Sequence, residues 1–115
     1  MVIILPSTPD GICIISTYDG VCQRINWNFV DGISGYNVYR APVPYGHFER
    51  LNTSLINGLT YWDTPPVTLH NDFWYEVSAE NVDAEGALSD PYSVWEQWVF
   101  GVTPSFPGLS LTNLL

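Results

Sequence analysis

The chain has 115 residues, which suffices for one domain with a buried core and leaves no room for a second. Twelve acidic residues against three arginines and no lysine give a formal net charge of −9. That charge repels phosphate backbones and anionic lipid surfaces, so nucleic-acid and membrane partners are disfavoured, and the lack of lysine excludes a lysine nucleophile or Schiff base.

Uncharged segments are found at both ends of the chain. Residues 1–8 are predicted to form an extended arm, because their apolar run lacks the basic start of a signal peptide and is too short to span a membrane. Residues 101–115 form a second apolar arm. Its large apolar residues, which a solvated tail would not favour, include Phe106, Leu109, Leu111 and Leu114. We expect this second arm to be bound, either to its own domain or to a neighbouring subunit.

A hairpin is predicted near the N-terminus. A segment rich in β-branched residues precedes Asp19-Gly20, which is a strong signal for a two-residue turn. That turn places Cys13 opposite Asn26. The thiols of Cys13 and Cys22 are then four residues out of step, so we expect both to be free.

The strand after this turn ends in Trp27, and residues 33–40 form the next strand. Tyr36 and Val38 lie two residues apart and therefore point to one side of an extended strand. Further along, residues 73–80 alternate, with Tyr75 and Val77 on a single face. We expect these five residues, Trp27, Tyr36, Val38, Tyr75 and Val77, to form the core between two sheets.

The remaining segments are also typical of short strands separated by turns. Strands are predicted at residues 47–52, 59–63 and 92–100, and an acidic loop at residues 82–90. No stretch has the 3.6-residue periodicity of a helix. Seven short strands at regular spacing predict an all-β, immunoglobulin-like sandwich over residues 9–100.

These residues resemble a fibronectin type III domain, in the wording of bacterial and phage members. The motifs that carry the resemblance are Ile25-x-Trp27, Gly35-Tyr36-x-Val38, Leu59-x-Tyr61-x-Asp63, Tyr75-x-Val77-x-Ala79-x-Asn81, and Gly86 followed by Ser89 and Pro91. The resemblance implies a seven-stranded sandwich, a fold that serves as spacer, adhesion module or binding scaffold. One position departs from the family. Phe73 stands where the family usually has a tyrosine whose hydroxyl fixes a corner, so that hydrogen bond is absent or supplied by another group, and we expect a looser corner.

The sequence gives no sign of catalysis or of a cofactor. His47 and His70 are the only histidines, and no serine or cysteine lies in a nucleophile motif. Three acidic residues around Gly86 suggest a calcium loop, but their spacing is not that of an EF-hand, and an acidic turn explains them better. We therefore expect a protein that is not an enzyme and that binds no metal.

Aromatic residues provide the candidate interface. Tyr39 and Trp74 are predicted to point outward from one sheet, together with either Trp95 or Trp98 on the last strand, of which Trp95 is the selected interface residue. There they could contact protein or sugar, or be covered by the chain's own arms. The favoured hypothesis is a structural assembly protein of a phage virion, such as a decoration, neck, collar or tail subunit, bound to copies of itself or to other virion proteins. Its particle would be assembled in the host cytoplasm. The alternative is an extracellular carbohydrate- or receptor-binding module of a secreted glycosidase or adhesin.

Overall fold

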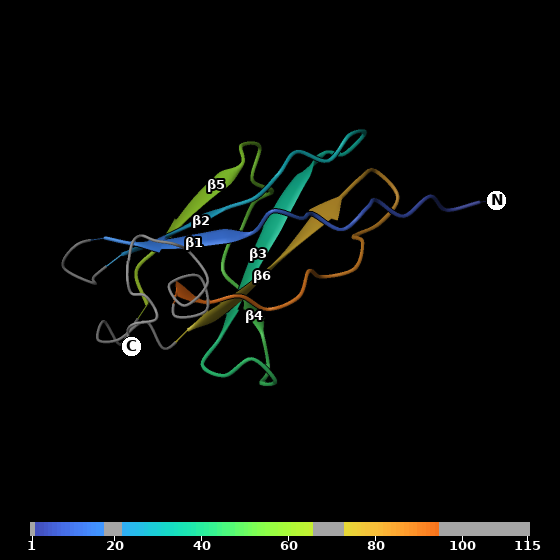
Figure 1. Cartoon of the computed structure of the whole chain (residues 1–115). Coiled ribbons are helices and arrows are strands. Elements are labelled where there is room, and N and C mark those ends of the chain that lie inside the picture. Colours follow the sequence, from blue (N-terminus) through green and yellow to red (C-terminus); the bar gives the residue numbers. More distant parts are fainter. Residues whose placement is uncertain (1, 18–21, 66–72, 95–115) are drawn as a thin grey trace, which may run out of the picture.

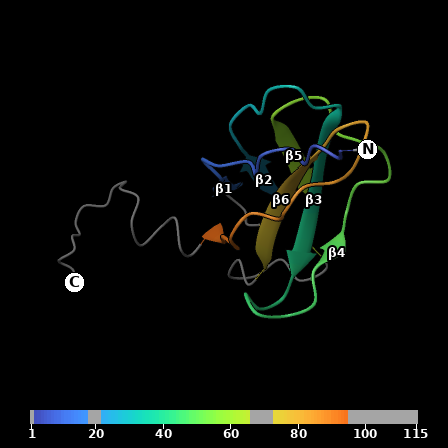
Figure 2. The same cartoon turned by 90° about the vertical axis from the view of Figure 1, so that its right-hand side faces the viewer.

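A computed structural model describes residues 2–17, 22–65 and 73–94 of the chain. These residues form two three-stranded antiparallel sheets that face each other (Figures 1 and 2). The first sheet has the order β1-β2-β5, and the second has the order β4-β3-β6. The strands are β1 (Cys13–Ser16), β2 (Gln23–Asn26), β3 (Gly35–Ala41), β4 (Glu49–Arg50), β5 (Thr60–Asp63) and β6 (Trp74–Glu80). None of the described segments forms a helix long and apolar enough to cross a bilayer.

The core lies between the two sheets, where strand alternation places the large side chains. Ile14, Ile25 and Tyr61 point inward from adjacent positions of the first sheet. The five residues expected in the core from the sequence are buried, with exposed fractions of 3% for Trp27, 1% for Tyr36, and 0% for Val38, Tyr75 and Val77. The rings of Trp27 and Tyr36 have centroids 5.4 Å apart and are tilted by 58°, an arrangement that aromatic pairs favour.

The register of the first hairpin is the expected one. Cys13 pairs with Asn26 across β1 and β2, and the two cysteines are free. The Asp19-Gly20 turn itself lies outside the described residues. Because a one-residue slip would turn Ile14 and Ile25 to solvent, the burial of these two side chains fixes the pairing.

One asparagine and one serine side chain accept hydrogen bonds from backbone amides of the second sheet, where a neighbouring strand would otherwise supply the carbonyl. The Asn52 Oδ1, two residues after the short strand β4, accepts a hydrogen bond from the Val38 amide at 2.9 Å. The Ser89 Oγ accepts one from the Val77 amide at 3.0 Å. The expected strand at residues 47–52 is limited to Glu49–Arg50. Beyond it, the Val38 amide donates to the Asn52 side chain and not to a backbone carbonyl.

The described residues contain six strands, where the sequence predicts seven. A segment of irregular backbone lies along the free side of β6 instead, with Gly86, Ser89 and Tyr92 each donating an amide hydrogen bond to it. Tyr92 forms an isolated bridge with Tyr75, and the greater part of the expected last strand, residues 95–100, lies outside the described residues. The sandwich is therefore present, and its last position is occupied by a bridged segment.

Candidate functional site

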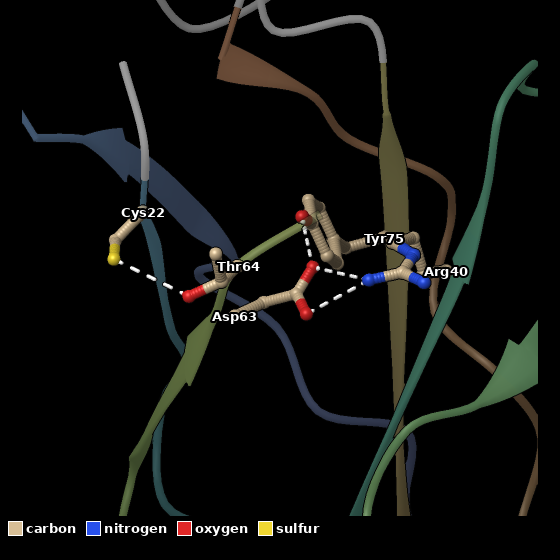
Figure 3. A network of polar contacts seen from close by, with 5 residues as sticks. All are labelled: Cys22, Arg40, Asp63, Thr64 and Tyr75. Carbon is tan, nitrogen blue, oxygen red and sulfur yellow. Dashed lines mark hydrogen bonds and ion pairs between the residues drawn. The ribbon is translucent and has the colours of Figure 1, made fainter. Parts of the chain in front are cut away.

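A polar network joins the two sheets at one end of the core (Figure 3). The Arg40 Nη1 lies 2.9 Å from both carboxylate oxygens of Asp63, and the Tyr75 hydroxyl donates to Asp63 Oδ2 at 2.6 Å. Burial and this carboxylate raise the pKa of Tyr75, so its hydroxyl remains a donor. On the outer side of Asp63, the Cys22 Sγ lies 3.4 Å from the Thr64 Oγ1. Both oxygens of the Asp63 carboxylate accept hydrogen bonds within this network, so its role is to stabilise the fold.

Phe73, the departure from the family pattern, packs beside this network. It is half-buried against the core, and the Arg40 guanidinium lies 5.3 Å from its ring centroid. Two residues later, Tyr75 lies on the same inner face by alternation, and its hydroxyl donates a hydrogen bond to Asp63. The corner itself, residues 66–72, lies outside the described residues, so the expected looseness there stays a prediction.

The outer face of the second sheet holds two of the predicted interface residues. Tyr39 lies opposite Glu76, and Trp74 lies opposite Ala41. Both aromatic side chains are half-buried. Burial, and then its hydrogen bond to Glu85, raises the pKa of Tyr39 to about 12. These two aromatics lie on the outer face, and each is partly covered.

Glu85 covers this face from the turn after β6. One of its oxygens, Oε2, accepts hydrogen bonds from the Tyr39 hydroxyl at 2.5 Å, from Asn37 Nδ2 at 3.4 Å and from the Ser78 hydroxyl. Glu76 is on the same face, and burial followed by the charge of Asp90 raises its pKa. The described part of the outer face of the second sheet therefore combines two half-buried aromatic side chains with polar and acidic groups, and the interface expected there stays a prediction.

The remaining predicted interface residues, Trp95, Phe106, Leu109, Leu111 and Leu114, lie outside the described residues.

The outer face of the first sheet carries an aromatic residue that the sequence analysis did not select. Six side chains point outward from its three strands: Cys13, Ile15, Arg24, Asn26, Thr60 and Trp62. We call this surface the Trp62 face. Trp62 is 57% exposed and Ile15 is 42% exposed. Alternation along residues 59–63 could have placed Trp62 outward, since Tyr61 and Asp63 point inward.

Arg24 supports the exposed ring of Trp62. Ile15, Arg24 and Trp62 occupy one row across the three strands, and the Arg24 guanidinium carbon lies 5.6 Å from the Trp62 ring centroid. Arg24 makes no ion pair with any residue that the structure describes, and its Nε is buried without a hydrogen-bond partner. Since the guanidinium covers one side of the indole, the exposed area of Trp62 belongs to the remainder of the ring.

The N-terminal arm exposes a run of large apolar side chains. Val2, Ile3, Ile4 and Leu5 are 80%, 58%, 64% and 62% exposed. The arm extends past the end of β6 and away from the sheets (Figure 1). We call residues 2–5 the apolar arm.

The described residues contain no group of three or more His, Cys, Asp or Glu side chains that could hold a metal ion. His47 is exposed, and His70 lies outside the described ranges. The acidic residues near Gly86 are not gathered around a common point, because Glu85 turns back onto the sheet to accept hydrogen bonds.

The sequence matches no model of a protein family and no curated protein. The fold, by contrast, is similar to solved structures. A Fn3-like protein from Clostridium thermocellum superposes with a TM-score of 0.70 and 27% sequence identity, over 76% of this chain and 90% of that one. The structure of FN3tt matches with a TM-score of 0.63 and 17% identity, over 76% of this chain and 92% of that one.

The chain is thus an all-β sandwich domain with the fibronectin type III fold. This fold typically supports structural and binding roles.

Proposed function

We propose that this domain is a non-enzymatic binding module that attaches to a protein subunit through its apolar arm. The observation that carries the proposal is the exposure of four consecutive large apolar side chains, each at least 58% accessible. A solvated segment gains nothing from exposed isoleucines, whereas full burial of each stabilises a complex by about 1.5–3 kcal/mol. Because residues 1–8 carry no charged side chain, no side-chain charge has to be desolvated in such a contact.

The arm is held in place at its base. The Asn81 Nδ2 donates a hydrogen bond to the Ile4 carbonyl at 2.7 Å, and Pro6 packs on Gly86, where a Cβ would lie 2.6 Å from the Pro6 carbonyl oxygen. These contacts order the backbone while leaving the apolar side chains accessible. Less conformational entropy is then lost on binding than for a free tail.

Within this class we propose a subunit of a virus particle, such as a decoration, neck, collar or tail accessory protein. A small sandwich with a pre-ordered apolar arm suits attachment to a repeating protein surface. The net charge of −9 supports a protein partner over nucleic acid or an anionic membrane.

Co-sedimentation with native particles from the source of the protein tests this function. We expect the full chain to sediment with a large assembly, and the arm variant Ile3→Asp/Ile4→Asp to remain in the soluble fraction. Tyr45→Asp is the matched control, because Tyr45 is 86% exposed and lies in a loop of the sandwich away from the arm. Equal sedimentation of the arm variant and the full chain would exclude the arm as the attachment point.

The second candidate is a carbohydrate-binding module, which the exposed Trp62 favours. The free side of its indole could stack on a sugar ring, with Asn26 and Thr60 nearby as polar groups. The two candidates respond to different variants. Glycan binding would be lost with Trp62→Ser and unaffected by Ile3→Asp/Ile4→Asp.

A further inference from the structure

Two surfaces of this acidic chain carry no carboxylate. The apolar arm has no charged residue, and the six side chains of the Trp62 face include one arginine and no acid. The opposite sheet face, by contrast, carries Glu76, Glu80 and Glu85. Two copies that approach through most other surfaces bring like charges together, which costs free energy. Among the described surfaces, the apolar arm and the Trp62 face are the places where a second copy meets least repulsion.

The apolar arm and the Trp62 face also match in apolar character and in length. Four extended residues span roughly 13 Å, and the three strands of the Trp62 face span about 10 Å from the outer strand to the opposite one. Ile15 and Trp62 lie at the two ends of one row, with the guanidinium of Arg24 between them. An apolar segment laid across this row covers both exposed side chains.

The arm does not reach the Trp62 face of its own chain in this arrangement. It is tied to Asn81 and Gly86, which follow β6, a strand of the other sheet. In Figure 1 the N-terminal trace continues away from β1, β2 and β5. The apolar arm of each copy therefore remains available to the Trp62 face of another copy.

We propose that the apolar arm of one copy packs on the Trp62 face of a second copy, so that the domain self-associates through arm exchange. This proposal rests on the proposed function and names the partner as another copy of the same chain. Ile3 and its neighbours cover Ile15 and the free side of Trp62, while Arg24 remains stacked on the indole. The contact is apolar, and electrostatics oppose it through the net charge of each copy.

Analytical ultracentrifugation of the full chain tests the proposal. We expect concentration-dependent self-association, weakened at least about tenfold by the arm variant Ile3→Asp/Ile4→Asp and by either face variant, Trp62→Asp or Ile15→Asp. Tyr45→Asp is the control and should associate like the full chain. Two face variants are included because an effect shared by both is not explained by a folding defect of one of them.

Mixing two variants provides the decisive test. The arm variant retains an intact face, and the Trp62→Asp variant retains an intact arm. An equimolar mixture should therefore form a one-to-one complex, with one contact in place of two, that is tighter than the self-association of either variant alone. A mixture that stays monomeric, or variants that associate as tightly as the full chain, would overturn arm exchange.

Salt separates this contact from a charge-driven one. Association should strengthen as sodium chloride is raised, because salt screens the repulsion between two copies of charge −9. Weakening with salt would instead indicate that Arg24 binds a carboxylate, and would contradict the proposal.

The proposed function can be judged separately from self-association. If the full chain is monomeric but the arm variant still loses co-sedimentation, only self-association is wrong, whereas normal co-sedimentation of the arm variant excludes attachment through the arm.

Discussion

The guanidinium of Arg40 on β3 and the carboxylate of Asp63 on β5 join the two sheets through the interior, with Nη1 2.9 Å from both oxygens. Asp63 is 8% exposed and Arg40 is 20% exposed. Removing one partner of a buried pair leaves the other charge unpaired. We expect Arg40→Ala to lower the free energy of unfolding by about 3–5 kcal/mol in urea denaturation. Arg50→Ala, at an exposed position of β4, is the control and should change stability by less than about 0.5 kcal/mol.

Trp27 is buried and Trp62 is exposed, so replacing Trp27 should destabilise the fold far more than replacing Trp62. Trp27→Ala removes a ring that is 3% exposed and packed on Tyr36, so it should cost on the order of 3–5 kcal/mol. Trp62→Ala removes a ring that is 57% exposed, and at low protein concentration it should change stability by less than about 0.5 kcal/mol. Chemical denaturation of both variants provides the measurement. Comparable losses for the two would mean that the Trp62 face is already covered within the monomer.

Both cysteines should react as free thiols. Cys13 pairs with Asn26, and the Cys22 Sγ lies near Thr64, so neither sulfur faces the other. Ellman's reagent should titrate two thiols per chain in the unfolded protein without prior reduction. A mass lower by two protons, together with no titratable thiol, would instead reveal a disulfide and contradict the hairpin register.

Alkaline pH should destabilise the fold partly through Tyr39. Burial and the Glu85 hydrogen bond raise its pKa from 10.0 to about 12, so between these values the folded state holds a proton that the unfolded state has lost. The stabilisation is complete below pH 10 and is lost as the pH rises towards 12. Tyr39→Phe should therefore make the unfolding free energy fall less steeply over this range. An unchanged slope would show that the Tyr39 hydroxyl is not held by Glu85 in solution.

The core could be predicted from the sequence because it depends on a two-residue period. Alternation assigned Tyr36 and Val38 to one side of β3 and Tyr75 and Val77 to one side of β6, and all four are buried. The register of the first hairpin followed from a turn dipeptide. In both cases the information is local, so no knowledge of distant segments was needed.

The surfaces were harder to predict because they depend on contacts between distant residues. Trp74 points outward as its position in the strand indicates, but it is half-buried. Tyr39 is on the same face, and its hydroxyl donates a hydrogen bond to Glu85, which is 46 residues away in sequence. Trp62 had an outward position in its own strand, and only the pairing of β5 with β2 shows that Arg24 supports it. Sequence alternation gives the side of a sheet, and tertiary packing decides what remains exposed.

Cross-linking between copies most directly tests the central claim, that the apolar arm of one copy occupies the Trp62 face of another. A photo-reactive amino acid is placed at Ile3 in an isotopically heavy chain, which is mixed with the light chain and irradiated. Mass spectrometry should then find heavy-to-light cross-links at residues on or beside the row of Ile15, Arg24 and Trp62. Cross-links confined to single chains, or located on the acidic face around Glu76, would contradict the account.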